Sequence, residues 1–348
     1  GIAALTLGVG VVTMGTAGLL HYRRRRNSAV GDRLRSELFE RLFASDPEWD
    51  PWVGGLSRIE RRRLRSLLEE FLRKLQGTEH RRLRALGEAL GVQSGARRDL
   101  TRSRRRFRAL TRLALLHEPV DPDDLKACCA DDPQLRAGAA RVLHEAEHPD
   151  APRIGTDLLV SGESLTVFGL DTLYRLNEGT ETPVLSPLEE GAEGWSDRLL
   201  VQVLIVLRYC NIADPRGRLG WLPTLLAHES PRVRAAAVGV LERHGWREEF
   251  QTQVNIDALL SDPEESVRHD TYLLLASWNT ERSAQLLRET LESAPHEDLL
   301  ELTRACSLHS RIDISTLPAR FDPFVEWVRA DEATGRTRRV WGVSAAWT

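Results

Sequence analysis

The sequence has few residues of several types, and each shortage excludes a class of protein. Four cysteines among 348 residues, without a Cys-x-x-Cys spacing, exclude a disulfide scaffold and indicate a reducing compartment. Aromatic residues make up only 6%, while leucine, alanine and arginine are abundant, which favours helices over strands. We find no glycine-rich phosphate loop and no Ser/His/Asp arrangement. The sequence therefore predicts an all-α protein that is not an enzyme and needs no cofactor.

Charged residues are distributed unevenly along the chain. Residues 1–20 carry none, residues 21–112 hold 25 basic residues against 12 acidic ones, and residues 113–348 hold 23 against 39. The net charge of −3 therefore hides a basic segment followed by an acidic one. An acidic region favours a partner with a basic or arginine-bearing surface.

The first twenty residues contain an uncharged run over residues 2–20, long enough to cross a hydrocarbon core of ~30 Å. The basic residues that follow it directly are Arg23, Arg24, Arg25 and Arg26. A cleaved signal peptide has the opposite order, and the positive-inside rule places the N-terminus outside. We expect a single-pass helix over 1–22 in the inner (cytoplasmic) membrane, with the remaining residues in the cytoplasm. A buried hydrophobic helix is the alternative interpretation.

Residues 23–97 are predicted to form a basic helical neck. The spacing of apolar residues predicts amphipathic helices over 32–44 and 57–76. Ser57-Arg58-Ile59-Glu60 has the pattern of a capping box, in which two side chains satisfy free backbone donors at a helix start. A third helix is expected from Thr78 to about Leu90, where Gly91 ends it.

A further arginine-rich helix is expected to start near Leu100. Its candidate contacts with an anionic surface are Arg102, Arg104, Arg105, Arg106 and Arg108. Such residues suit a solvated or internally paired helix face, anionic lipid headgroups, or a protein partner. Nucleic-acid binding through the segment 58–112 is kept as an alternative because arginine also suits phosphate. No recognised nucleic-acid motif accompanies these arginines, so nucleic acid is the least favoured partner.

A repeat with a period of about 34 residues is the strongest signal in the sequence. The segments 230–241 and 262–275 each contain a turn with proline, a Val-Arg pair and an apolar helix, and a similar segment covers 131–143. Partner helices are expected between them at 218–227, 250–260 and 282–291. Neither helix of such a pair can bury its apolar face alone, so the pairs are expected to stack.

This pattern resembles the HEAT-repeat (armadillo-like helical) family over roughly residues 98–312. The resemblance implies a right-handed α-solenoid of helical hairpins with an arginine–aspartate ladder between repeats. The ladder residues that it implies here are Arg136, Arg234, Arg268, Asp132 and Asp262. The copies at 164–173 and 198–207 lack the arginine. Members of the family are chiefly protein-binding scaffolds, although some bind nucleic acid and a few are associated with lyase or glycosylase activity.

Two segments depart from the repeat. Gly179–Asp197 is acidic and rich in proline and glycine, and we expect in part a surface loop that docks through Leu188 and Trp195. Residues 313–348 are expected to hold a capping helix at about 323–330, followed by a polar, tryptophan-containing tail. That tail is either disordered or a docking peptide.

One motif points to chemistry. His144-Glu145-Ala146-Glu147-His148 has the spacing that places two zinc ligands and a general base on one face of a helix. Pro149 follows at once, and the candidate third ligand, Glu163, lies in a turn between repeats. We therefore expect no metal, and a zinc hydrolase remains a minor alternative.

Taken together, the sequence predicts a non-catalytic, membrane-tethered adaptor. One N-terminal helix would hold a cytoplasmic helical-repeat domain at the membrane, where it binds a protein partner. A membrane enzyme complex, such as one for envelope polysaccharide synthesis, fits this location.

Overall fold

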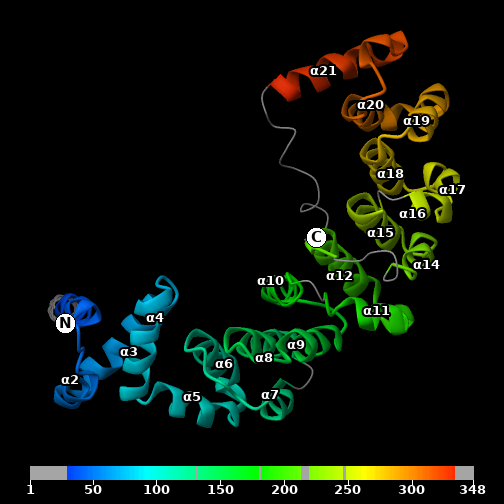
Figure 1. The fold of residues 1–348 in the computed structure, drawn as a ribbon. Coiled ribbons are helices and arrows are strands. Elements are labelled where there is room, and N and C mark those ends of the chain that lie inside the picture. The colour runs from blue at the N-terminus through cyan, green and yellow to red at the C-terminus, as the bar shows by residue number, and fades with distance from the viewer. Residues whose placement is uncertain (1–29, 130–131, 180–181, 213–218, 246–247, 334–348) are drawn as a thin grey trace, which may run out of the picture. The chain divides into compact units, whose positions relative to one another are not determined.

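The protein is all-α over the residues that the structure describes. The computed structural model describes residues 30–129, 132–179, 182–212, 219–245 and 248–333, and these contain helices and turns but no strand (Figure 1). The all-α prediction is therefore confirmed for this part of the chain.

Within the described part, no helix is both long and apolar enough to span a bilayer. The predicted membrane helix over 1–22, the basic residues that follow it at 23–26, and the tryptophan-containing tail over 334–348 lie outside the described residues.

The chain forms two compact units, which are described separately. The first unit comprises residues 1–128 with 145–147, and the second comprises 129–144 with 148–348. The helices of the first unit are 30–43, α2 (Trp49–Gly55), α3 (Arg58–Leu72), α4 (Gly77–Ala89), α5 (Val92–Leu100), η1 (Ser103–Arg105), α6 (Arg106–Leu115) and α7 (Pro122–Cys129). Leucines from helix 30–43, α3 and α4 meet in one core, in which Leu34, Leu64 and Leu83 are fully buried. Each such side chain contributes about 1.5–3 kcal/mol by leaving water.

The predicted capping box is present at the start of α3. The Ser57 N–H donates to Glu60 Oε2 at 2.9 Å, and the Glu60 N–H donates to Ser57 Oγ at 3.4 Å. The helix ends at Leu72, four residues before the predicted end at 76. Gly77, five residues after this end, has a φ of +67°, a left-handed backbone conformation that residues other than glycine rarely adopt.

The prediction of one arginine-rich helix starting near Leu100 is wrong. The chain instead ends α5 at Leu100, makes the short turn η1 and starts α6 at Arg106. The side chains around this point explain the break: Thr101 Oγ1 donates to the carbonyl of Arg98 at 2.9 Å, and Arg106 Nε donates to the carbonyl of Leu100 at 3.1 Å. These bonds satisfy backbone acceptors at the end of α5 that a continuing helix would have used.

The second unit contains longer helices that alternate with shorter ones. They are α8 (Pro133–Glu145), α9 (Ala151–Val160), α10 (Val167–Leu176), α11 (Leu185–Gly191), η2 (Ala192–Gly194), α12 (Asp197–Tyr209), α14 (Leu222–Leu226), α15 (Pro231–His244), α16 (Glu248–Gln253), α17 (Ile256–Leu260), α18 (Glu265–Trp278), α19 (Glu281–Ser293), η3 (His296–Asp298), α20 (Leu299–Leu308), η4 (Ile314–Thr316), η5 (Ala319–Phe321) and α21 (Asp322–Ala333). The helix α12 packs on α15, α15 on α18, α18 on α20 and α20 on α21. The shorter helices α14 and α17 pack on α15 and α18, respectively, so these two long helices each have a shorter partner.

Two local predictions in this unit need correction or extension. The segment Gly179–Asp197 is not simply a surface loop, because it contains α11, whose Leu185 and Leu188 are buried. The predicted docking is confirmed for Leu188, whereas Trp195 is only partly buried. The capping helix is longer than predicted, as α21, and it buries Val328 while Trp327 stays exposed.

Candidate interaction surface

Bidentate arginine–aspartate pairs join successive helix pairs of the second unit. Arg234, near the start of α15, donates from Nε and Nη2 to Asp262 in the turn before α18, with both distances 2.7 Å. Its Nη1 donates to the carbonyls of His228 and Glu229 at 2.9 Å each. One guanidinium therefore fixes its own turn and the next turn at once.

The same arrangement recurs one helix pair later. Arg268 on α18 donates from Nε to Asp298 Oδ2 at 2.7 Å and from Nη2 to Oδ1 at 2.9 Å. Its Nη1 donates to the carbonyls of Asp262 and Pro263 at 2.9 and 3.3 Å. Sequence reasoning missed Asp298 because no proline follows it. Its position 30 residues after Arg268, close to the 28 between Arg234 and Asp262, is the signal that identifies it.

Asp298 is fully buried and is the centre of a hydrogen-bond network. Besides Arg268, it accepts from Tyr272 Oη at 2.7 Å, and its Oδ1 lies 2.9 Å from His269 Nε2. Burial alone would raise the pKa of Asp298, but the hydrogen bonds from Arg268, Tyr272 and His269 lower it below its usual value. The carboxylate is thus held ionised.

The cluster around Asp298 also has the composition of a metal site. One ligand-type atom each from Glu265, His269 and Asp298 lies within 4.8 Å of the others. The Asp298 oxygens, however, already accept bonds from Arg268 and Tyr272, so a cation would have to displace a guanidinium. The geometry is that of a structural ion pair.

The remaining predicted ladder residues are arranged differently. Asp132 caps its own helix α8, accepting from the N–H groups of Gln134 and Leu135 at 2.8 and 3.3 Å. Arg136 is buried, and its guanidinium lies against Gly162 in the following turn. A Cβ at Gly162 would be 1.9 Å from Arg136 Nη2, so this glycine leaves the space that the guanidinium occupies.

A second set of ion pairs joins the long helices, and sequence reasoning did not predict it. Arg141 on α8 pairs with Asp171 on α10, and its guanidinium lies 4.9 Å from the ring centre of Phe168. Arg208 on α12 pairs in the same way with Glu242 on α15. The pairing partners are about one helix pair apart in the sequence.

Further charged groups continue from Arg208 and Glu242 across α18 and α20 to α21. Glu301 accepts from Arg304 at 2.7 Å, and the Arg304 guanidinium lies 4.4 Å from the ring centre of Trp327. Burial is the largest cause that raises the pKa of Asp270 to about 6; Arg208 and His269 act to lower this pKa, and the carboxylates of Glu242 and Glu301 act to raise it. These residues lie on α12, α15, α18, α20 and α21, most of which are the second, longer helix of a pair. We therefore name the set the second-helix row, and its members are Arg208, Glu242, Asp270, Glu301, Arg304 and Trp327.

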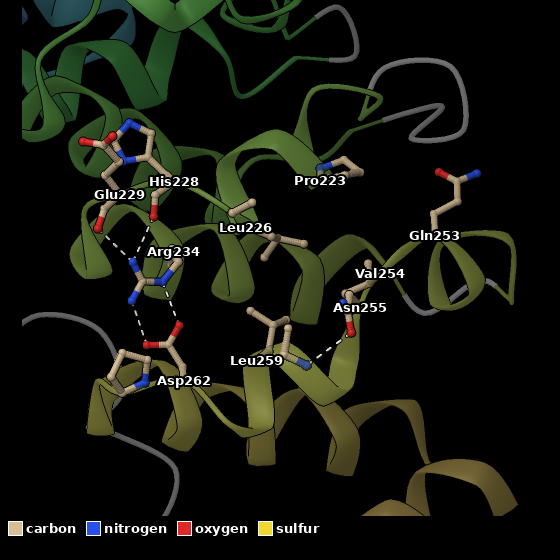
Figure 2. Close-up of a pocket in the computed structure, with 13 residues that line it drawn as sticks. Pro223, Leu226, His228, Glu229, Arg234, Gln253, Val254, Asn255, Leu259 and Asp262 are labelled. Atoms are coloured by element: carbon tan, nitrogen blue, oxygen red, sulfur yellow. Dashed lines mark hydrogen bonds and ion pairs between the residues drawn. The ribbon is translucent and has the colours of Figure 1, made fainter.

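A cleft of about 540 Å³ lies between successive shorter helices of this unit. Figure 2 shows the Arg234–Asp262 pair at one end, Leu226 and Leu259 in the middle, and Asn255 toward the other end. Asn255 Oδ1 accepts from the Ala258 N–H at 3.2 Å and so caps α17. Arg234 and Asp262, which line one end of the cleft, pair with each other, and the cleft is a groove between packed helix pairs.

The His-Glu-x-x-His motif does not lie on one continuous helix. The helix α8 ends at Glu145, and Glu147 has a φ of +53°. The His148 N–H donates to the carbonyl of Leu143 at 3.1 Å, and its Nδ1 accepts from the Asp150 N–H at 3.1 Å. Because the helix stops between the two histidines, they lack the shared helical face that the zinc motif requires. Glu145 instead lies 3.6 Å from His117.

Most of the candidate anionic-surface contacts have partners within the first unit. Arg102 and Arg105 contact Asp99, Arg106 contacts the carbonyl of Leu100, and Arg108 contacts Glu69. Arg104 is exposed. Exposed ion pairs of this kind are weak, so their arginines can exchange partners at low cost.

Several other arginines of the segment 58–112 bind helix ends. Arg82 donates to the carbonyls of Leu42 and Ala44, at the end of helix 30–43, and Arg65 donates to the carbonyl of Leu90. These bonds satisfy acceptors that helix C-termini leave free. The high arginine content of this segment thus has a structural use, which weakens the nucleic-acid interpretation.

The four cysteines are buried and unbridged. Burial raises the pKa of the Cys210 and Cys306 thiols to about 12, which leaves little reactive thiolate at neutral pH.

No protein-family model matches the chain, and no curated protein sequence matches it. The functional proposal therefore depends on the residues and their geometry.

Proposed function

We propose that the protein is a non-catalytic adaptor held at the inner membrane by residues 1–22. Its residues over roughly 98–312 form HEAT-like helical hairpins of a right-handed α-solenoid in the cytoplasm. The second-helix row presents Trp327, with the partly exposed Arg208 and Glu242, to a protein partner, which would have a basic or arginine-bearing surface. A membrane enzyme complex suits such a partner.

The repeated bidentate pair is the observation that supports this proposal best. Arg234–Asp262 and Arg268–Asp298 fix consecutive helix pairs in the same register, and the long helices α12, α15, α18 and α20 pack on one another in order. Stacked helix pairs of this kind expose one row of helices as an extended surface. Such an extended surface suits the binding of a protein partner.

Fractionation tests the membrane tether. The full chain is expected in the inner-membrane fraction after an alkaline carbonate wash, while a chain covering 21–348 is expected to be soluble and helical by circular dichroism. Full-length protein in the cytosol would contradict the tether and with it the proposed function.

Cross-linking in isolated membranes tests the binding surface. Trp327→Ser is expected to reduce recovery of a cross-linked partner identified by mass spectrometry. Phe107→Ser is the matched control, because Trp327 and Phe107 have exposed fractions of 46% and 47% and Phe107 lies in the first unit. Equal loss of the partner in both variants would exclude the second-helix row as the binding surface.

Nucleic-acid binding is the alternative function, and salt dependence separates it from the adaptor. A chain that binds DNA through the segment 58–112 would lose affinity steeply between 50 and 200 mM salt, by roughly 10³-fold or more for six or more phosphate contacts. We expect no binding of a mixed-sequence duplex at ~150 mM salt, measured by fluorescence anisotropy.

A further inference from the structure

Two phenylalanines on helix 30–43 lie at the exposed edge of the core of the first unit. Phe39 and Phe43 have exposed fractions of 40% and 63%, whereas Leu34, Leu38 and Leu42 of the same helix are buried. The rings of Phe39 and Phe43 stack with centres 6.2 Å apart. The ring of Phe39 also meets the buried Phe71 edge-on, at 5.2 Å and 89°. The contact with Phe71 therefore fixes the position of the Phe39 ring, on which Phe43 stacks.

Two basic residues lie about one helical turn from the aromatic rings, since Arg35 is four residues before Phe39 and Lys74 is three residues after Phe71. Arg35 on the same helix and Lys74 after α3 both contact Glu70, at 3.3 and 2.8 Å. Both cations are about half exposed or more, so they keep donors available to a second anion. Aromatic rings with a basic rim match the interface of an anionic membrane, where rings sit at headgroup level and cations meet phosphates.

The length of the preceding chain indicates which surface covers the pair. The uncharged run ends at residue 20 and helix 30–43 begins ten residues later. Ten residues reach at most ~35 Å, so a bilayer that holds residues 2–20 also keeps the helix near its surface. Such a tether raises the effective concentration of the pair at the bilayer, so a small patch is enough for contact.

We propose that Phe39 and Phe43 insert into the headgroup–acyl boundary of the membrane that holds residues 2–20, with Arg35 and Lys74 facing lipid phosphates. This inference depends on the membrane tether of the proposed function. It adds a second contact, which would fix the orientation of the first unit at the bilayer.

Spin-label accessibility in the full chain tests the inference. The four native cysteines are buried, so a nitroxide is attached selectively to Phe43→Cys. The protein is reconstituted in vesicles of phosphatidylcholine and phosphatidylglycerol, and collision with lipid-soluble oxygen is compared with collision with a water-soluble nickel chelate. We expect the oxygen-to-nickel ratio at position 43 to be several-fold higher than at the control Ile59→Cys. Ile59 is also exposed and apolar, and it lies twelve residues or ~18 Å along the helix direction from Phe71.

The outcomes separate the inference from the tether. Protein that is not recovered with the vesicles overturns the tether and the inference together. Recovery with equal ratios at positions 43 and 59 overturns the inference alone. A label at position 43 that neither reagent reaches also overturns it, since protein rather than lipid then covers the pair.

A second reporter, Ser36→Cys, guards against perturbation by the first label. Its ratio is expected to drop several-fold when Phe39→Glu and Phe43→Glu are added, with unchanged circular dichroism.

Discussion

Arg268 donates a hydrogen bond to each carboxylate oxygen of Asp298, from Nε to Oδ2 at 2.7 Å and from Nη2 to Oδ1 at 2.9 Å. The carboxylate is fully buried, whereas the arginine side chain keeps 13% of its surface exposed. Removing one partner would leave the other charge buried and uncompensated, which costs more than the pair itself contributes.

Asp298→Asn is therefore expected to lower the free energy of unfolding by about 3 kcal/mol. Chemical denaturation followed by circular dichroism measures this change. Glu297→Gln is the control, because this neighbouring carboxylate lies 4.0 Å from Arg268 and is 59% exposed. Its effect is expected to stay within about 0.5 kcal/mol, and an equal loss in both variants would show that Asp298 has no special role.

Gly162→Ala tests the contact with Arg136. The added methyl group would lie 1.9 Å from Arg136 Nη2, so the buried guanidinium has to move. We expect a loss of about 1–3 kcal/mol in the free energy of unfolding, as for other overpacked sites. Gly179→Ala should have no such cost, since among the described residues no atom beyond its chain neighbours lies within 4 Å of its added Cβ. Equal stability of the two variants would contradict the packing described here.

The sequence allowed α15 and α18 to be located, because the spacing of Val233 and Val267 indicates the apolar face that each of these helices buries. It did not identify Asp298, whose turn lacks the Asp-Pro pattern of Asp262. The pair Arg141–Asp171 was also missed. An ion pair between two helices depends on where the helices cross, and no local pattern of residues in the sequence predicts that crossing point.

The first unit shows the same limit at its arginines. Their density suggested a surface for an anion, but Arg82 instead donates to the carbonyls of Leu42 and Ala44. Arg81, next to it, is exposed and contacts Thr78 alone among the described residues. Only the folded structure distinguishes two adjacent arginines with such different roles.

Arg82→Met is accordingly expected to lower the free energy of unfolding by about 1–3 kcal/mol, because it leaves acceptors at the end of helix 30–43 without a donor. Arg81→Met should change it by less than about 0.5 kcal/mol. Thermal unfolding of both variants gives the comparison. A larger effect at Arg81 would contradict the capping role of Arg82.

The motif His144–His148 gives a metal prediction. Since α8 ends before His148, purified protein is expected to carry the same trace of zinc with and without His148→Ala. Elemental analysis after dialysis against a weak chelator measures it. One equivalent of zinc that disappears in His148→Ala would restore the hydrolase alternative.

Asp270 gives the sharpest predicted dependence of the free energy of unfolding on pH. Burial raises the pKa of this carboxyl to about 6 in the folded chain, against about 4 when unfolded, and the groups that face it are Arg208 on α12, Glu242 on α15, Glu301 on α20 and His269 on its own helix. The folded state therefore binds more protons than the unfolded state between these two values, so this group reduces stability as the pH rises from about 4 to 6.

Above pH 6 the full penalty of a buried charge remains, and Asp270→Asn removes it. We expect the variant to exceed the wild type by about 1–3 kcal/mol in free energy of unfolding at pH ~7.5, and the difference to vanish below about pH 4. Urea denaturation of both proteins across this pH range measures the difference between their free energies of unfolding. Groups that titrate alike in both proteins cancel from this difference. Asp257→Asn, at an exposed position on α17, should show no such window. A variant less stable than the wild type at pH ~7.5 would mean that the Asp270 carboxylate balances Arg208 in the folded chain.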